Sequence, residues 1–403
     1  MDKARDIHNY HRRLERTIER IETSEEFSEH NRRIVLKFKD SLLAENISSA
    51  KTSRYLQDVI WLNRQWKGKK DFDDANREDI IQIVAKMNQS SLAESTKKGL
   101  KIMLRKLYRN IRGITEKGKY PSEVDFFTLT ISKSNQLIPE ELLTEGEVYK
   151  IVKCCRSERD QALVVSLFET GCRIGEIGSM QIKHVSFEEK FAKLTVRGKT
   201  GMRRVVVVNS IPYLQSWINH HPKGDDPNAP LWINPQGTFL SYATIRYLLR
   251  KAAERAKIKK RVYPHLFRHT RATMMASKVP EAVMKQYLGW GQDSKMCGTY
   301  IHLNGEATDN AILKMNGIEV ENKVQKSILK SPVCPRCSHK NEFTAKFCRN
   351  CGLPLDEKEA MKIISEDNKR EQANEMMNSL MSDPDILEII KKKLNSQNYL
   401  NDI

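Results

Sequence analysis

The sequence lacks long apolar runs. None of its stretches approaches the roughly 18 consecutive apolar residues that a membrane-spanning helix needs, which excludes a membrane transporter. The N-terminal stretch MDKARDIHNYHRRLERTIER also lacks the apolar core of a secretory signal. We therefore expect neither a membrane partner nor a disulfide-rich secreted scaffold.

Acidic residues are in the minority. The chain has 51 Asp and Glu against 69 Lys and Arg, which gives a formal net charge of +18 and an isoelectric point near 9.4. Such a basic chain fits a polyanionic partner such as nucleic acid, and a Lys-rich solubilising surface is the alternative. The 403 residues predict two or three domains, and a hydrophobic content of 39% is enough for at least one sizeable core.

Four of the eight cysteines form two CxxC pairs, separated by ten residues: Cys334, Cys337, Cys348 and Cys351. In a chain without an export signal this spacing indicates metal ligands rather than disulfides. Four thiolates suit tetrahedral Zn²⁺ in a closed structural site, with no open position for catalysis. Four free thiols are the alternative. The surrounding basic residues are candidates for contact with DNA or a protein partner: Arg336, Lys340, Lys346 and Arg349.

The N-terminal part of the chain repeats apolar residues at helical spacing. A polar helix over 3–22 occupies the first segment, 1–25, and four helices separated by polar breaks predict a helical domain over 26–117. Gly118 and Pro121 interrupt the pattern, and we interpret 118–137 as a linker. The fourth helix carries a basic stripe, Lys97, Lys101, Arg105 and Arg109, which we expect to contact DNA phosphates. A solvated face and a membrane-surface helix are the alternatives.

The segment 138–315 predicts a second, larger domain. Thr144 and Glu147 have the spacing of a helix-capping box. Two strands over 191–196 and 203–208 flank a Gly-rich hairpin turn, and helices return after Ser241. The cysteine-rich segment 330–356 and a polar helical tail over 357–403 follow. The expected fold is therefore mainly α with a small antiparallel β-sheet, completed by a C-terminal zinc ribbon.

Four short segments of the larger domain carry residues suited to phosphate chemistry. They are TGCRIGEI (170–177), VRGKTGMRRVVV (196–207), HLFRHTRAT (265–273) and YLGWG…GTYIHL (287–303). Cleavage of a phosphodiester without metal needs a nucleophile, cations that hold the developing charge and an acid for the leaving oxygen. Arginine forks match phosphate oxygens, and a tyrosine hydroxyl can attack phosphorus.

These four segments, in this order, resemble the tyrosine recombinases, the phage-integrase and Xer-like enzymes, over about residues 25–315. By this resemblance 26–117 is a core-binding DNA-binding domain and 138–315 a catalytic domain. The resemblance implies a site-specific DNA recombinase or integrase. Such an enzyme cuts and rejoins double-stranded DNA through a 3′-phosphotyrosine intermediate, without metal or ATP in the chemistry. It further implies a homotetramer on two DNA sites. We expect the protein in the cytoplasm, associated with the nucleoid.

The resemblance also assigns roles to individual residues. Arg173 and Arg268 match the phosphate clamp, Lys199 the acid for the 5′ oxygen, His265 a phosphate ligand and acid–base helper, and Tyr300 the nucleophile. Trp290 stands where many members have a second histidine, and its indole N–H can donate the same hydrogen bond. Glu176 matches an acidic position that supports Arg173.

Several alternatives stay open at this point. Tyr263 and Tyr287 compete with Tyr300 as nucleophile, and Tyr300 is preferred because it follows Trp290 by ten residues, near the family's spacing. His269, next to Arg268, is ambiguous. A type IB topoisomerase-like enzyme and a non-catalytic DNA-binding regulator derived from an integrase are the competing functions.

Overall fold

The computed structural model describes residues 6–129, 139–198, 201–276, 278–301, 313, 315–316 and 327–396. The chain divides into two units. The first consists of Met1–Leu142, Arg173–Gln181 and Pro230–Tyr247, and the second consists of Leu143–Cys172, Ile182–Ala229 and Leu248–Ile403. Two short segments that the sequence places in the catalytic domain thus belong to the first unit.

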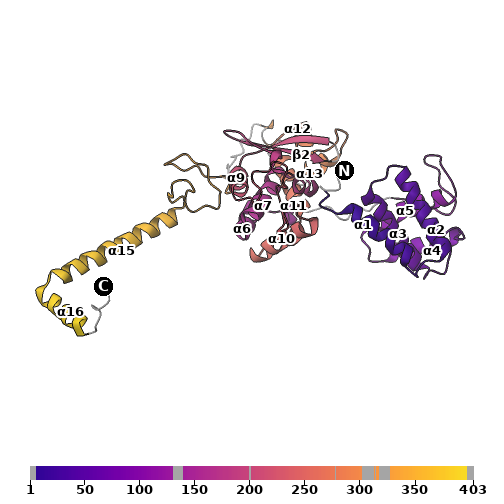
Figure 1. Ribbon diagram of the computed structural model, residues 1–403. Coiled ribbons are helices and arrows are strands. Elements are labelled where there is room, and N and C mark those ends of the chain that lie inside the picture. The colour runs from indigo at the N-terminus through magenta and orange to yellow at the C-terminus, as the bar shows by residue number, and fades with distance from the viewer. Residues whose placement is uncertain are drawn as a thin grey trace. The chain divides into compact units, whose positions relative to one another are not determined.

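The helical bundle of the first unit follows from the amphipathic pattern of its sequence. Its helices are α1 (Tyr10–Thr23), α2 (Glu29–Ala44), α3 (Ser49–Gln65), α4 (Arg77–Gln89) and α5 (Glu94–Ile111), drawn in indigo and purple in Figure 1. Val35, Phe38, Leu56 and Leu104 are fully buried in their common core. The four helices predicted within 26–117 correspond to α2–α5.

The first helix begins later than predicted. We expected helix from residue 3, but α1 begins at Tyr10, and Asn9 before it has a left-handed backbone with φ of +54°. The carboxylate of Asp6 accepts hydrogen bonds from the backbone N–H groups of His8 and Tyr10. This turn directs Ile7 onto Gly178, where an added Cβ would lie 2.5 Å from Ile7 Cδ1. Tertiary packing of Ile7 therefore overrides the helical pattern.

The described part of the segment interpreted as a linker packs on the bundle. Val124 and Phe127 are buried in the bundle core. Arg105 donates hydrogen bonds to the carbonyl oxygens of both residues, and its guanidinium lies 4.4 Å from the ring centroid of Tyr120. Residues 118–129 thus pack with the bundle. We expected a short strand over 126–131, but residues 126–129 form none, and the rest of the predicted linker lies outside the described residues.

The second unit is built around α7 and a small sheet. Its helices are α6 (Glu145–Lys153), α7 (Glu158–Thr170), α9 (Ile211–Asn219), α11 (Pro264–Ala276), α12 (Glu281–Leu288) and α13 (Met296–Ile301). α10 (Tyr242–Arg255) begins in the first unit and continues in the second. The capping box at the start of α6 is confirmed, since Thr144 Oγ1 accepts from Glu147 N–H and Glu147 Oε2 accepts from Thr144 N–H.

The sheet has three antiparallel strands in the order β1 (Val185–Phe187), β2 (Ala192–Gly198) and β3 (Gly201–Val207). The predicted hairpin is confirmed, with Ala192 opposite Val207 and Gly198 opposite Gly201. The sequence missed β1, because three residues are too short to show strand alternation. The mainly α fold with a small antiparallel sheet agrees with the prediction.

Two helices close the described chain: α15 (Glu357–Ser382) and α16 (Pro384–Ser396). α15 buries none of its residues, in agreement with the polar composition from which a helical tail was predicted. Across the described ranges no helix combines the length and apolarity needed to cross a membrane.

Candidate active site

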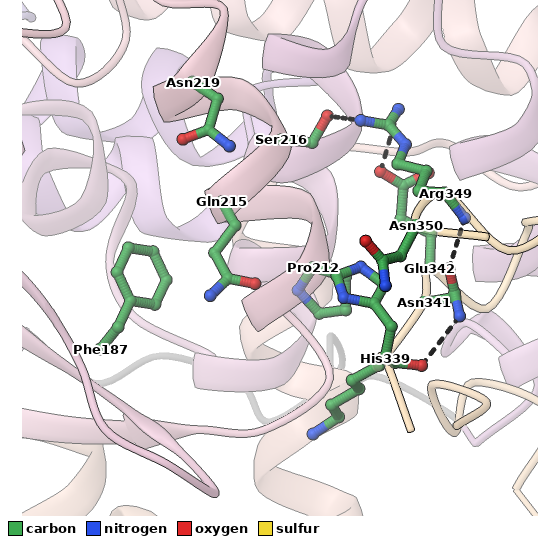
Figure 2. Close-up of a pocket in the computed structure, with 11 residues that line it drawn as sticks. Phe187, Pro212, Gln215, Ser216, Asn219, His339, Asn341, Glu342, Arg349 and Asn350 are labelled. Carbon is green, nitrogen blue, oxygen red and sulfur yellow. Dashed lines mark hydrogen bonds and ion pairs between the residues drawn. The ribbon is translucent and has the colours of Figure 1, made fainter. Parts of the chain in front are cut away.

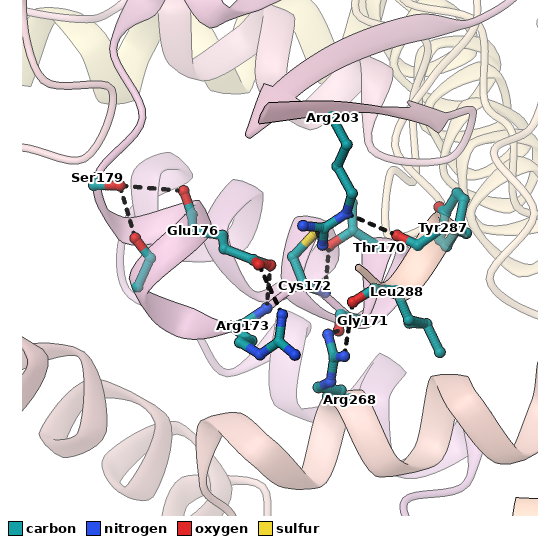
Figure 3. Close-up of polar contacts among 11 residues, drawn as sticks. Thr170, Gly171, Cys172, Arg173, Glu176, Ser179, Arg203, Arg268, Tyr287 and Leu288 are labelled. Atoms are coloured by element: carbon teal, nitrogen blue, oxygen red, sulfur yellow. Dashed lines mark hydrogen bonds and ion pairs between the residues drawn. The ribbon is translucent and has the colours of Figure 1, made fainter. Parts of the chain in front are cut away.

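Arg268 is held on α11 by the carbonyl ends of two other helices. Its Nη1 donates to Gly171 O at 3.0 Å and its Nη2 donates to Leu288 O at 2.7 Å (Figure 3). Gly171 caps the end of α7 and Leu288 ends α12, and helix C-termini carry unpaired carbonyls and partial negative charge. These two acceptors orient the guanidinium and favour its charge. The side chain is buried, with 4% of its surface exposed.

Glycine is required at the ends of both helices. Gly171 and Gly289 have φ of +57° and +64°. A Cβ at Gly171 would lie 2.9 Å from Arg271 Cβ, and one at Gly289 would lie 2.5 Å from Arg203 Nη1. The two residues therefore turn the chain after α7 and α12 at positions where a side chain has no room.

Tyr300 lies on α13 against Trp290. The two rings are stacked at 5.5 Å between centroids and 11° between planes. The guanidinium carbon of Arg268 lies 5.3 Å from the centroid of the Trp290 ring. Leu288 and Cys297 belong to the same buried cluster. The structure thus brings two predicted site residues, Arg268 and Tyr300, against the indole ring of a third, Trp290.

The hydroxyl of Tyr300 is hydrogen-bonded to His269, with Nδ1 at 2.7 Å. Burial, followed by electrostatic repulsion from the neighbouring His265 and Arg268, lowers the pKa of His269 to about 4. The imidazole is therefore neutral at pH 7 and can accept the phenol proton. Burial raises the pKa of Tyr300, and Arg268 opposes this rise. The sequence left His269 ambiguous because its partner lies 31 residues further along the chain.

Arg173 and Glu176 form a pair at the start of α8 (Ile174–Gly178), in the first unit. Glu176 Oε2 accepts from the backbone N–H of Arg173 at 2.8 Å, and Oε1 accepts from its Nη1 at 3.1 Å (Figure 3). The Glu176 side chain is buried, whereas that of Arg173 is 34% exposed. The carboxylate therefore fixes the backbone and the guanidinium of Arg173 together.

Arg203 on β3 is a residue that sequence reasoning missed. Its Nε donates to Tyr287 O at 3.0 Å and its Nη2 to Cys172 Sγ at 3.4 Å (Figure 3). It ties the strand to the C-terminal end of α12. Strand alternation gave a usable signal, because Arg203 shares a face with the buried Val205 and Val207.

Two further predicted site residues are His265 and Lys199. His265 is an exposed residue of α11, and its ring centroid lies 6.0 Å from that of His269. Lys199 lies outside the described residues, between the paired ends of β2 and β3 in the sequence.

Three of the four residues of the predicted basic stripe on α5 make polar contacts within their own unit. Lys97 pairs with Glu94 at 2.9 Å. Arg109 Nη2 donates to the carbonyl oxygens of residues 114–116, the shortest of these bonds being 2.9 Å to Glu116. Arg105 holds the segment 124–127, as described above. Within the described residues, Lys101 is the stripe member for which the structure shows no polar partner. The stripe as a DNA contact stays a prediction.

The four C-terminal cysteines converge. Their Sγ atoms all lie within 4.8 Å of one another, with Cys334 and Cys351 at 3.6 Å and Cys337 and Cys348 at 3.5 Å. A disulfide needs about 2.05 Å, whereas four thiolates about 2.3 Å from one Zn²⁺ lie about 3.8 Å apart. Asn341 Nδ2 donates to Cys348 Sγ at 3.6 Å. The donor set therefore fits a tetrahedral metal ion.

Comparison with known proteins gives a family match for part of the chain. Residues 141–307 match the phage integrase family. A tyrosine recombinase XerC of Anoxybacillus flavithermus is 28% identical over 171 residues, which are 40% of this chain and 56% of that protein. A tyrosine recombinase of Pseudothermotoga lettingae is 27% identical over 251 residues, 60% of this chain and 83% of that protein. The match spans little more than half of the first relative's length.

A solved structure supports the fold. The XerH site-specific recombinase, bound to a palindromic difH substrate in a post-cleavage complex, has a TM-score of 0.53 and 17% identity. The alignment covers 78% of this chain and 98% of that one. The family match ends at residue 307, before the four cysteines begin.

Proposed function

We propose that the chain, of which residues 141–307 match the phage integrase family, is a site-specific DNA recombinase or integrase like the tyrosine recombinases it resembles. Its substrate is double-stranded DNA, which the net charge of +18 favours. The observation that carries the proposal is the environment of Tyr300. Its hydroxyl is hydrogen-bonded to a neutral His269, its ring stacks on Trp290, and Arg268 lies over the same indole ring. This arrangement presents a nucleophile, a proton acceptor and a cation together.

The reaction forms one phosphate ester for each one that it breaks. Tyr300 Oη attacks phosphorus, its proton passes to a base, and the bond to the 5′ oxygen breaks. Lys199 supplies the proton that makes this oxygen a 5′ hydroxyl. The reverse attack by a 5′ hydroxyl of the second DNA releases Tyr300 and rejoins the strand. Because the bond energy stays in the phosphotyrosine, neither ATP nor a metal ion is needed for the chemistry.

The arginines stabilise charge on the transferring phosphate. Arg268 is oriented by two helix-terminal carbonyls, and Arg173 is fixed by Glu176, so neither has to be ordered when the transition state forms. Their planar forks match phosphate oxygens. Trp290 contributes its indole N–H as a donor, and His265 acts as a phosphate ligand. Lys97, Lys101, Arg105 and Arg109 remain proposed phosphate contacts outside the reacting centre.

We assign proton acceptance to His269 because of its 2.7 Å contact with the Tyr300 hydroxyl. The phosphate of bound DNA adds negative charge, which raises the pKa of His269 from about 4 toward the working pH. His269→Gln should lower the cleavage rate by roughly 10²-fold, the lower range for loss of a general base. The variant should also lose the acid limb of the pH–rate profile, since protonated His269 accepts no proton.

The matched control is His265→Gln, one helical turn away on α11. If His265→Gln removes the acid limb and His269→Gln retains it, proton acceptance belongs to His265. Rates are measured from single-turnover covalent adduct formation at several pH values.

The cysteine cluster is proposed to hold one structural Zn²⁺. When bound, the ion cross-links the two cysteine pairs and supplies no catalytic chemistry. We expect one zinc per chain by elemental analysis and substantially less in Cys348→Ser. The matched control, Cys155→Ser, should keep full stoichiometry because Cys155 lies outside the cluster. Full zinc content in Cys348→Ser would contradict the site.

We further propose that four protomers act on two DNA sites in the cytoplasm, where the nucleoid lies. A supercoiled plasmid carrying two copies of a fragment from the protein's own genetic element should yield recombinant circles. A plasmid with one copy is the control. Relaxation without exchange would favour the topoisomerase, and tight binding without either product would favour the regulator.

A further inference from the structure

The cysteine module, which we define as residues 330–356, packs on the second unit through an aromatic contact. The ring of Phe343 lies 5.0 Å from that of Tyr213 on α9 and 6.0 Å from that of Tyr149 on α6. Tyr213 is buried, and its hydroxyl lies 2.9 Å from Thr344 Oγ1. The module is therefore docked on the helices of its own unit.

Three basic side chains of the module make polar contacts with other parts of the chain: Lys340, Lys346 and Arg349. Arg349 Nη2 donates to Glu158 Oε1 at 2.8 Å and lies 3.4 Å from Glu342 Oε1, and its Nη1 donates to Ser216 Oγ. Ser216, Glu342 and Arg349 line a cavity of about 450 Å³ beside α9 (Figure 2). Lys340 and Lys346 are also engaged, with Val208 O and Glu359 respectively.

Of the five Lys and Arg residues of the module, Lys330 and Arg336 are the two whose side chains make no polar contact with another described residue. The positive charge available for DNA phosphates on the module is correspondingly small. This disfavours an independent nucleic-acid-binding finger, for which several unpaired cations are needed.

The module forms hydrogen bonds with Val208 and Asn209, the residues that follow β3. Ser331 N–H donates to Asn209 Oδ1 at 3.3 Å, Ser331 Oγ donates to Asn209 O at 3.2 Å, and Lys340 Nζ donates to Val208 O at 2.9 Å. From α7, the carboxylate of Glu169 accepts from the backbone N–H groups of Val208, Asn209 and Ser210 at 2.7–2.9 Å. This three-residue segment is thus held from two sides.

Asn341 links the residues that make these hydrogen bonds to the cysteine cluster. It is buried at 2% exposure, its Oδ1 accepts from Arg349 N–H at 2.9 Å, and its Nδ2 contacts Cys348 Sγ. Asn341 stands between Lys340, which holds Val208, and Glu342, which holds Arg349. Loss of the metal would therefore loosen the residues that dock the module.

We propose that the metal-loaded cysteine module is an internal brace that fixes Val208–Ser210 and thereby the β2–β3 hairpin. The partner of the module is thus the catalytic domain of the same chain. β3 lies between the braced segment and the hairpin turn. Arg203, and the Tyr287 hydroxyl that donates to Val206 O at 3.0 Å, tie β3 to the C-terminal end of α12. The consequence for catalysis rests on the proposed function, in which Lys199 of this hairpin protonates the 5′ oxygen.

Hydrogen exchange on the full-length, zinc-loaded protein tests the brace without any DNA. Chelation should raise the exchange rates of the Val208, Asn209 and Ser210 amides on the order of tenfold, as local opening becomes easier. Lys340→Met should raise them while zinc content stays at one per chain. The matched control, Arg336→Met, should leave them unchanged. Unchanged exchange after zinc loss, or in Lys340→Met, overturns the brace.

DNA binding and cleavage provide the second readout. Lys340→Met should bind DNA like wild type and cleave roughly tenfold more slowly. A substrate with sulfur in place of the leaving 5′ oxygen should restore its rate, because a thiolate leaves without an acid. If Arg336→Met weakens DNA binding while exchange stays constant in every variant, the module is a DNA-binding finger. If neither the wild type nor any variant forms a covalent adduct, the proposed function is wrong. The hydrogen-exchange result still shows whether the module acts as a brace.

Discussion

Tyr300→Phe should bind DNA with wild-type affinity and form no covalent protein–DNA adduct. Phenylalanine keeps the stack on Trp290, so the buried cluster is preserved. The variant loses only the hydroxyl and its hydrogen bond to His269, at a cost of about 1 kcal/mol in stability. Adduct formation should fall below detection because the nucleophilic oxygen is absent.

Denaturing gels of protein incubated with a nicked suicide substrate measure this directly. Tyr287→Phe is the matched control, since Tyr287 is the competing tyrosine of the same segment and its hydroxyl bonds to Val206 O. An adduct that survives in Tyr300→Phe and disappears in Tyr287→Phe would move the nucleophile to Tyr287.

Arg268→Ala should lower the cleavage rate by on the order of 10²- to 10³-fold, the usual effect of losing one preorganised donor for transition-state charge. It should also destabilise the fold by a few kcal/mol, because Gly171 O and Leu288 O lose their common donor. Thermal unfolding and single-turnover cleavage separate the two effects.

Arg268→Lys distinguishes charge from geometry. A single ammonium keeps the charge but lacks the fork that serves both carbonyls. We expect a smaller loss of stability than in Arg268→Ala and cleavage still slowed at least tenfold. Cleavage at the wild-type rate in both variants would show that Arg268 only links α7 to α12.

The periodic parts of the fold are predictable from the sequence, and the parts that depend on distant partners are not. The apolar spacing in α2–α5 and the Val-rich strand β3 define their own faces. The start of α1 at Tyr10 instead reflects Ile7 packing on Gly178, 171 positions away. A three-residue strand such as β1 exists only because β2 pairs with it.

The candidate site shows the same division. The motifs place Arg268 in one segment and Trp290 and Tyr300 in another, and the fold brings the three side chains together. The role proposed for His269 rests on the 2.7 Å contact between its Nδ1 and the Tyr300 hydroxyl, which the sequence does not show. On α5 the spacing of Arg105 and Arg109 predicts a basic surface, but it carries no information about the carbonyls of Val124 and Glu116 that accept from them. Helical periodicity gives the direction of a side chain and not its partner.

The most direct test of the central claim is to locate the covalent bond. Wild-type protein is incubated with nicked duplex fragments of its own genetic element, without metal or ATP. The trapped adduct is then digested and analysed by mass spectrometry. We predict a nucleotide linked through its 3′ phosphate to the peptide that contains Tyr300, and a free 5′ hydroxyl on the released strand. Attachment at another residue, or tight binding to every fragment with no adduct, would contradict it.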